Sequence, residues 1–369
     1  MTPRGQRTQQ LIAALGRDWD IELISMPAQG HRGGGGTTGR SLARQLASWG
    51  VQQTLFDRWE LWARRRFSRW RPDADAAVLI VAPWSLAAIA APQLRGADVP
   101  YVIDAGDPWA VGLAEPGGTI AARRGLRAER PIWEGAAGGI LTTPQQASRM
   151  QARYPNLPIL ARPNGYEAPV KVAAPVEPPA PDPTVLRLVH LGVIYAARLD
   201  PMPLLVRLRD SGRWKTIRFD QFGGDPEGML ADAPAGVEVR NHTAIPWAEV
   251  VARTGEFDAA LVLGNELGEL LPSKAIQYLT LPIPRIAITD TERDDALADF
   301  ARDHVAWLAV APGDPDAARL IGEHVEHPWT AAELAPPPAD SWSTVGSELA
   351  DFVDSCVGAG APRGATAAR

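Results

Sequence analysis

The sequence predicts an α/β protein built from two doubly wound, Rossmann-like domains. Three observations favour this class. Short β-rich apolar runs alternate with segments of helical period, the apolar runs are continuous, and one proline-rich stretch divides the chain near its middle. The chain has 369 residues, of which 46% are hydrophobic and 22% charged, so it is long enough for two cores.

The first part of the chain, residues 1–167, is expected to form one α/β domain. Its predicted strands are residues 20–26, 76–83, 100–106 and 138–143. Its predicted helices include residues 8–15 and 144–154. Parallel strands of this kind are apolar throughout because helices cover both faces of their sheet.

A proline-rich connector is expected over residues 168–184. Six prolines fall between Pro169 and Pro183, in the stretch "PVKVAAPVEPPAPDP". Such a composition favours a stiff, extended chain and disfavours a buried element.

The alternation of strands and helices resumes over residues 185–338, which predicts a second α/β domain. The expected strands are residues 186–192, 217–223, 237–243, 257–264, 284–290 and 304–310. The expected helices lie near residues 201–210, 246–253, 273–280, 294–302 and 315–324. A last helix is expected within residues 339–356, because "SWSTVGSELADFVDSC" opens on serine and has apolar residues at helical spacing, and residues 357–369 read as a loose tail.

Charge and composition exclude several classes of function. The net charge of −6 argues against a protein that coats nucleic acid, and no apolar run approaches the roughly 20 residues that cross a bilayer. The chain opens on "MTPRGQRTQQ", which is too polar for a secretory signal, and Cys356 is its only cysteine. These features predict a cytoplasmic protein without disulfides.

Residues 58–72, "RWELWARRRFSRWRP", interleave aromatic residues with arginines, and two interpretations stay open. The segment could lie on an anionic membrane surface or bind an acidic acceptor, which would make the protein peripheral at the membrane. Alternatively, the helix buries Trp59, Trp62, Phe67 and Trp70 beneath the sheet and leaves its arginines in water.

A lysine lies where a helix disfavours a cation. In "LLPSKAIQYLTLPIPRIAIT", residues 270–289, a helix is expected to begin at Ser273, which could cap it, and Lys274 falls in the first turn. The amino end of a helix carries partial positive charge, so a bound phosphate would make this arrangement favourable. Gln277 lies on the same face about 4.5 Å further along the axis, a spacing that suits ribose beside a diphosphate. The alternative is a solvated lysine and glutamine on an exposed face.

A second candidate phosphate contact follows the first strand of the second domain. In "LVHLGVIYAARLDP", Gly192 ends the strand and Arg198 precedes a helix. A glycine at a strand's carboxyl end lets a ligand approach the backbone, and an arginine can form two hydrogen bonds to phosphate oxygens. The alternative is a tight turn at Gly192 and a solvated charge at Arg198.

Five segments together resemble retaining glycosyltransferases of the GT-B fold, those of glycosyltransferase family 4. They are "YVIDAGDPWA", "ILARPNGYE", "LVHLGVIYAARLDP", "PSKAIQYLTLPIPRIAI" and "SWSTVGSELADFV". These segments occur in the family's order over about residues 3 to 355. The resemblance implies two Rossmann-like domains that face each other across a cleft, with the last helix crossing back to the first domain.

The resemblance also implies the donor site. Gly192, Arg198 and Lys274 would hold the diphosphate of a nucleotide-sugar next to Ser273, and Ile245 would contact the base through its backbone. Arg198 and Lys274 would be catalytic, because they stabilise charge on the leaving diphosphate.

Further roles follow from the same resemblance. Glu269 and Gln277 occupy the two ends of the family's Glu-x7-Glu motif, whose first glutamate faces the sugar and whose second binds ribose. Asp107, a third catalytic candidate, would lie near the transferred sugar or the acceptor, and Gly5 would contact the acceptor. No metal and no cofactor besides the nucleotide-sugar co-substrate are expected.

Two departures from the family pattern stand out. Position 277 is glutamine where the family has glutamate, so a charge-assisted bond to ribose becomes a neutral one, which is roughly half as strong. In addition, "PRGQRTQQLIAAL" resembles the end of the family's glycine-rich loop and the helix after it. The resemblance then implies either that the recorded start is too late or that the sheet lacks the family's first strand.

The sequence therefore predicts a glycosyltransferase that moves a sugar from a nucleotide diphosphate-sugar to an acceptor hydroxyl, with retention of configuration. Two alternatives remain open. One is a nucleotide-sugar epimerase on the same fold, and the other is a non-catalytic partner subunit that has kept the fold. The base, the sugar and the acceptor, whether glycan, lipid-linked or small molecule, are not specified by the sequence.

Overall fold

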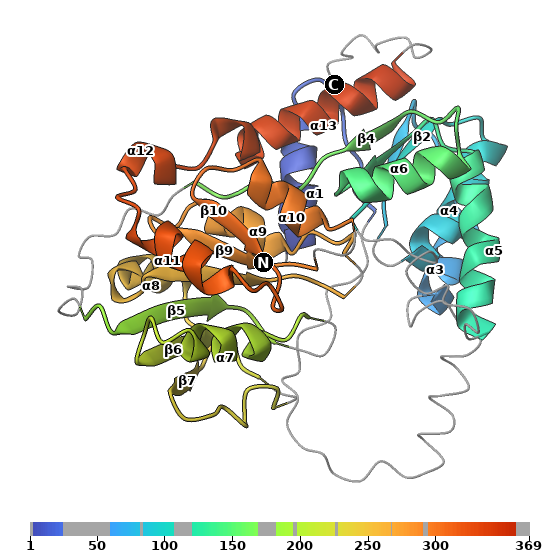
Figure 1. Ribbon diagram of the computed structural model, residues 1–369. Helices are drawn as coiled ribbons and strands as arrows, with labels where there is room; N and C mark the ends of the chain where they lie inside the picture. The colour runs from blue at the N-terminus through green and yellow to red at the C-terminus, as the bar shows by residue number, and fades with distance from the viewer. Residues whose placement is uncertain are drawn as a thin grey trace. The chain divides into compact units, whose positions relative to one another are not determined.

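The computed structural model describes residues 3–24, 60–81, 84–106, 120–168, 182–194, 198–225, 228–266, 268–290 and 294–358. The chain divides into two compact units. The first unit consists of Met1–Thr142, Gln146–Arg162 and Gly346–Arg369, and the second of Thr143–Gln145 and Pro163–Val345. Each unit is an α/β layer structure, labelled by element in Figure 1.

The first unit contains a parallel four-stranded sheet in the order β1-β2-β3-β4. The strands are β1 (Ala77–Ile80), β2 (Tyr101–Ala105), β3 (Gly138–Leu141) and β4 (Ile159–Ala161). Its helices are α1 (Pro3–Leu15), α3 (Glu60–Phe67), α4 (Trp84–Gly96), α5 (Ile120–Glu134) and α6 (Pro144–Arg153), together with most of α13 (Trp342–Val357). All five residues of β2 are buried, as expected for a strand covered on both faces.

One predicted strand of the first unit is wrong in its described part. Residues 20–24 form no strand, and residues 25 and 26 lie outside the described residues. The run alternates apolar and acidic residues, yet Leu23 is 60% exposed. The alternation is therefore not matched by a buried face. The short strand β4, which the sequence did not predict, has only three residues.

A buried ion pair joins α1 to β2 in the first unit. The Nε atom of Arg7 lies 2.9 Å from Oδ1 and 3.0 Å from Oδ2 of Asp104, and both side chains are almost fully buried. Arg7 also donates to the backbone carbonyl of Arg162 at 3.1 Å. These contacts hold the helix that carries Gly5 against the carboxyl end of β2.

The helix α13 packs onto α1 within the first unit. At Gly346 the helices approach so closely that a Cβ atom would lie 3.2 Å from the carbonyl oxygen of Gln10. Trp19 donates its indole N–H to Asp354 at 2.8 Å. The sequence pattern of this last helix, expected within residues 339–356, is confirmed by α13.

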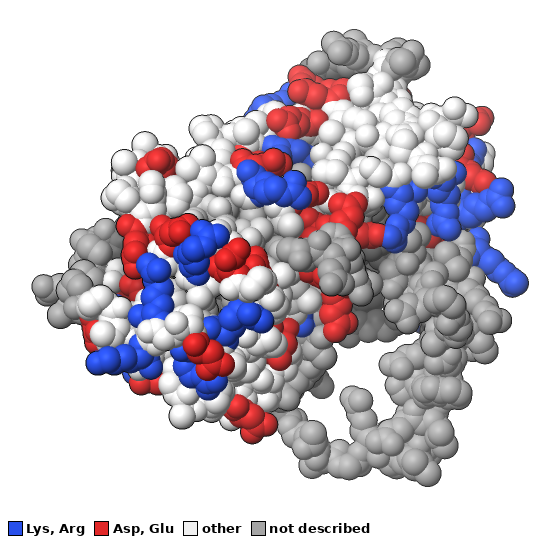
Figure 2. All heavy atoms as spheres, in the orientation of Figure 1, with Lys and Arg blue, Asp and Glu red and all other residues white. Residues whose placement is uncertain are grey.

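Basic side chains mark the surface of the first unit. In α3, Ala63 and Phe67 are buried, whereas Arg64, Arg65 and Arg66 are exposed. Further exposed arginines lie on α5 and α6, where blue spheres gather in Figure 2. Contact of residues 58–72 with a membrane stays a prediction. In the described part of the chain, no helix is long and apolar enough to span a bilayer.

The second unit contains a parallel six-stranded sheet in the order β10-β9-β8-β5-β6-β7. The strands are β5 (Val185–Leu191), β6 (Thr216–Phe222), β7 (Val237–His242), β8 (Ala259–Leu263), β9 (Arg285–Ile288) and β10 (Trp307–Val310). All six correspond to predicted strands. Counted within this unit, the order is 6-5-4-1-2-3, the doubly wound Rossmann arrangement. The chain reverses direction across the sheet between β5 and β8, so this is the switch point.

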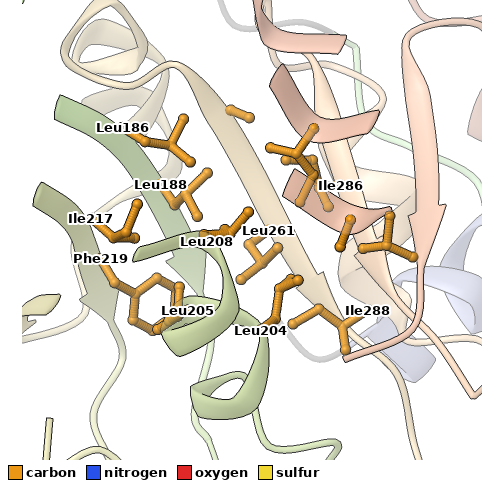
Figure 3. Close-up of a cluster of buried hydrophobic side chains, with 14 of the residues drawn as sticks. Leu186, Leu188, Leu204, Leu205, Leu208, Ile217, Phe219, Leu261, Ile286 and Ile288 are labelled. Carbon is orange, nitrogen blue, oxygen red and sulfur yellow. The ribbon is translucent and has the colours of Figure 1, made fainter. Parts of the chain in front are cut away.

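Helices cover both faces of this sheet (Figure 1). They are α7 (Met202–Asp210), α8 (Trp247–Ala252), α9 (Ser273–Tyr278), α10 (Ala296–Arg302), α11 (Ala317–Glu326) and α12 (Ala331–Leu334), with 3-10 turns at Thr254–Glu256 and Pro338–Asp340. Alternate residues of β5 enter different cores. Leu186 and Leu188 pack with α7 residues such as Leu204 (Figure 3), whereas Val189 and Leu191 pack in the cluster that contains α9.

Arg285 secures the carbonyl end of α9. This side chain is 1% exposed, and all its hydrogen bonds go to backbone carbonyls. Nε donates to Tyr278 at 3.0 Å, and one terminal nitrogen donates to Leu279 at 2.9 Å, Leu334 at 2.9 Å, and Leu281. Burial lowers the pKa of Arg285 to about 10, so the side chain stays charged at neutral pH. The cation thereby satisfies carbonyl groups that a helix end leaves without partners.

Replacing Arg285 with methionine should therefore destabilise the protein. Arg285→Met keeps an apolar chain of similar length but leaves buried carbonyls without a donor, so we expect a loss of about 3 kcal/mol in the free energy of unfolding. Urea denaturation followed by circular dichroism measures it. Arg302→Met, at a side chain that is 70% exposed on α10, is the control and should cost at most about 0.5 kcal/mol. Equal losses in the two variants would contradict the role of Arg285.

Candidate functional site

The candidate site lies at the carboxyl edge of the second unit's sheet, where β5 and β8 are neighbours. In sheets of this topology, ligands bind beyond the strand ends at the switch point. Here the loop that follows β5 and the loop that follows β8 meet, and the first turn of α9 lies at the same edge. The residues predicted to hold a diphosphate come from these segments.

Two glycines at this edge pass close to one another. Gly192 has φ +154° and Gly223 has φ +128°, conformations that side chains rarely allow. The N–H of Gly192 donates to Phe222 at 2.7 Å. A Cβ atom at Gly223 would lie 2.7 Å from the carbonyl carbon and oxygen of Gly192. The loops after β5 and β6 can therefore make this contact only with glycine at position 223.

Gln221 holds the loops after β5 and β6 together through hydrogen bonds. This side chain is fully buried on β6, opposite His190 in the register. Its amide donates to the carbonyl of Gly192 and, at 3.1 Å, to that of Gly224. Gly224 in turn accepts from the N–H of Ile194 at 3.1 Å. The backbone around Gly192 is thus held in place before any ligand binds.

Arg198 is oriented by an asparagine that sequence reasoning missed. Arg198 is half-buried and donates to Oδ1 of Asn265 at 2.7 Å and to the carbonyl of Leu263 at 3.4 Å. The amide of Asn265, which is 8% exposed, donates to Leu270 at 2.8 Å. Asn265 therefore connects the arginine to the loop that leads into α9. A polar residue two positions after the end of β8 was the only sequence signal for it.

Lys274 lies over Gly192. The Cβ position that Gly192 lacks is 3.9 Å from Cε and 4.0 Å from Cγ of the lysine. Solvent reaches part of this exposed side chain, but the protein atoms around it desolvate the ammonium group and lower the pKa of Lys274. No ion pair joins Lys274 to a carboxylate of the described residues. The lysine is thus a cation at the sheet edge without a counter-charge from that part of the chain.

The expectation that Ser273 caps α9 is wrong. The cap position is Pro272, with φ −58° and ψ 124°, and no side chain caps the helix. Ser273 is the first helical residue. Pro272 is the last residue before the helix and has no N–H of its own. Its carbonyl accepts a hydrogen bond from the N–H of Ala275 at 2.8 Å. The serine remains beside Lys274 in the first turn.

Tyr278 ties α9 to the end of β5. Its hydroxyl accepts the N–H of Leu191 at 2.6 Å, and the side chain is fully buried. Burial raises the pKa of Tyr278, so the phenol stays neutral. Because Leu191 precedes Gly192, this bond sets where Lys274 lies above the glycine.

His190 is a second residue that sequence reasoning did not single out. It is 6% exposed on β5, and Nδ1 lies 2.9 Å from the carbonyl oxygen of Leu261. Burial, opposed by the hydrogen bond to Leu261 and assisted by the nearby charges of Arg198 and Lys274, lowers the pKa of His190 to about 4. Its sequence signal was a single polar residue inside the apolar strand "LVHLG".

The remaining predicted donor residues lie around this edge. Gln277 is half-buried on α9, one turn after Lys274, and Glu269 is half-buried in the loop before that helix. Ile245 follows β7 and packs against the apolar cluster that includes α8 and α9. The structure thus supplies each of them from a segment at the carboxyl ends of β7 and β8.

The two predicted acceptor-side residues belong to the first unit. Gly5 is half-buried in α1. Asp107 lies outside the described residues, so its role stays a prediction. Among the residues that the structure describes, no group of three or more His, Cys, Asp or Glu side chains could hold a metal ion.

Comparison with solved structures shows the fold. HepE of Anabaena in complex with UDP matches with a TM-score of 0.50 and 13% identity over 76% of this chain and 79% of that chain. The GtfA/B complex matches with a TM-score of 0.51 and 11% identity over 80% of this chain and 60% of that chain. Sucrose-phosphate synthase from Thermosynechococcus elongatus matches with a TM-score of 0.48 and 16% identity over 76% and 71%.

These matches confirm the predicted fold class, an α/β chain with two Rossmann-like domains, the GT-B fold. The sequence itself matches no protein-family model and no curated protein. Sequence identities of 11 to 16% are too low to show more than the fold.

The contact between the two glycines predicts a difference between neighbouring variants. Gly223→Ala and Gly224→Ala both place alanine at positive φ, at +128° and +96°, but only the first methyl group would meet backbone atoms of Gly192. We expect Gly223→Ala to lose about 1–3 kcal/mol more stability than Gly224→Ala. Urea denaturation of the two variants measures the difference, and equal stabilities would contradict the close approach.

Proposed function

We propose that this protein is a glycosyltransferase that moves a sugar from a nucleotide diphosphate-sugar to an acceptor hydroxyl. Transfer proceeds with retention of the anomeric configuration, and protein cations, not a resident metal ion, stabilise the leaving diphosphate. The observation that carries the proposal is the position of Lys274, which lies over Gly192 at the switch point without a carboxylate partner among the described residues. A cation in that place is favourable once an anion binds.

A diphosphate is the anion that suits this edge of the sheet. Gly192 leaves room for an oxygen to approach the backbone, and Lys274 offers a point charge. Arg198 adds a planar donor group that Asn265 holds in place. The fold supports the same ligand class, because the Anabaena structure of this fold was determined with UDP.

The rest of the donor is assigned as the resemblance to glycosyltransferase family 4 implies. Gln277, one turn along the same helix, binds the ribose hydroxyls, and the backbone at Ile245 contacts the base. Glu269, in the loop before α9, faces the sugar. Asp107 and Gly5 are assigned to the acceptor side.

The chemistry is charge stabilisation. The bond between the anomeric carbon and the diphosphate oxygen breaks, and the electron pair leaves with the nucleoside diphosphate. A new bond forms from the anomeric carbon to the acceptor oxygen, whose proton is released to solvent. Arg198 and Lys274 are already in place as negative charge grows on the diphosphate, so they lower the barrier without reorganising.

Replacing Lys274 should strongly weaken the binding of a nucleoside diphosphate and should change the stability of the protein little. We expect Lys274→Ala to weaken binding of UDP, or of the nucleoside diphosphate that binds best, by roughly 10- to 100-fold, or about 1.4–2.8 kcal/mol. The melting temperature should be unchanged within error, because no ion pair within the described residues is lost. Isothermal titration calorimetry and thermal denaturation measure the two effects.

Lys215→Ala is the matched control, because Lys215 is an exposed lysine of the same unit between α7 and β6. It should bind as the unchanged protein does. An equal loss of stability and affinity in Lys274→Ala, or an equal loss of affinity in both variants, would contradict the assigned role.

Turnover decides between the proposed function and its alternatives. Incubation with donors of each binding base, followed by proton NMR, should show sugar transferred to an acceptor, or slowly to water, in the anomeric form of the donor. Binding without turnover for any donor would indicate a non-catalytic partner subunit. Free sugar epimerised at its second carbon would indicate an epimerase.

A further inference from the structure

His190 lies beside the diphosphate site, and the function proposed above gives it no task. It occupies the penultimate position of β5, two residues before Gly192, and is 6% exposed. A polar side chain buried in a mostly apolar strand is costly unless its polar atoms are hydrogen-bonded. The contacts of its two ring nitrogens indicate a role in ligand binding.

One ring nitrogen is fixed by the sheet. Nδ1 lies 2.9 Å from the carbonyl oxygen of Leu261 on the neighbouring strand β8. A carbonyl oxygen only accepts, so Nδ1 must carry the hydrogen. In the neutral ring, Nε2 is then left with a lone pair and is an acceptor.

The other ring nitrogen borders the position where the ligand approaches. Nε2 lies 3.5 Å from the Cβ position that Gly192 lacks, and Cε of Lys274 lies 3.9 Å from the same position. These are ordinary contact distances, so there is room for one atom above the glycine. That atom would touch both the imidazole and the lysine chain.

A phosphate oxygen in this space would favour the protonated form of the His190 ring over the neutral form. Without a ligand, the charged groups of the described residues that face His190 are Arg198 and Lys274, both cations, and together with burial they keep the ring neutral. A neutral Nε2 would repel a phosphate oxygen, because both atoms are acceptors. A protonated Nε2 would donate a charge-assisted hydrogen bond, and the anion offsets the two cations.

We infer that His190 is a donor-binding residue that takes up a proton from solvent when the diphosphate binds and then donates Nε2–H to a phosphate oxygen. This inference rests on the proposed nucleotide-sugar function. The proton comes from the buffer, and no covalent bond forms or breaks. The complex therefore holds more protons than the separate protein and ligand.

Proton uptake has a defined sign. Because the bound state holds the extra proton, affinity rises as pH falls, by up to about tenfold per pH unit while the full proton is taken up. The effect ends below about pH 4, where the free protein is already protonated at His190. The phosphate of the nucleotide also titrates near pH 6. The contribution of the protein to the pH dependence of affinity must therefore be separated from that of the ligand.

Calorimetry separates the two contributions. UDP is titrated into the protein at pH 7 in buffers of different ionisation enthalpy, and the slope of the observed enthalpy against the buffer enthalpy gives the number of protons taken up. His190→Gln places an amide N–H near the site of Nε2 without a titrating group. The ligand's ionisation is common to both proteins, so the difference in slope belongs to His190.

We expect the unchanged protein to take up roughly half to one proton more than His190→Gln. The variant should still bind UDP, with the excess pH dependence removed. His327→Gln, at an exposed histidine after α11, is the control and should keep the slope of the unchanged protein. Equal slopes for the unchanged protein and His190→Gln would overturn the inference.

Two further outcomes are informative. If no nucleoside diphosphate binds the unchanged protein, the proposed function fails and the inference fails with it, whereas binding with equal slopes overturns the inference alone. If His190→Gln does not fold, nitrogen-15 NMR of the histidine rings in the unchanged protein provides the same test. One ring that is neutral at pH 6 should become protonated when UDP is added, and a ring that stays neutral would overturn the inference.

Discussion

The hydrogen bond from the N–H of Leu191 to the hydroxyl of Tyr278 is the contact on which the candidate site depends. Leu191 ends β5 and Tyr278 ends α9, so the 2.6 Å bond fixes a helix of only six residues to one point on the sheet edge. Because the bond is buried, breaking it would leave an N–H without a partner. Arg285 holds the carbonyl end of the same helix. Together the two contacts place α9 so that the side chain of Lys274 lies beside Gly192.

A site that gathers cations must orient them without neutralising them. Asn265 meets this need, because its amide oxygen accepts from Arg198 at 2.7 Å and carries no charge. A carboxylate in the same place would hold the arginine more tightly, but it would compete with an anionic ligand for that charge. In the free protein, Arg198 and Lys274 disfavour a positive charge on the ring of His190. A bound anion offsets this effect.

The sequence predicted the elements of the second unit well because buried parallel strands have a strong signature. Leu186 to Leu191 are apolar apart from two positions, and both faces of the sheet are covered. The prediction was wrong where either of two neighbouring residues could begin the helix. Ser273 suits the cap position of α9, but Pro272 occupies it. Asn265 and His190 could not be predicted as site residues, since their roles come from partners 67 and 71 residues away in the chain.

The charge of the ligand changes during the proposed reaction, and the site suits the later state. A nucleoside diphosphate carries one more negative charge after the sugar leaves than it did as a sugar ester. Fixed cations such as Arg198 and Lys274 therefore bind the departing diphosphate more strongly than the intact donor, which lowers the barrier to bond cleavage. A proton on His190 would act in the same direction, because it places a third positive charge beside the diphosphate. The same cations that disfavour a charged ring in the free protein thus favour the charge distribution of the transition state.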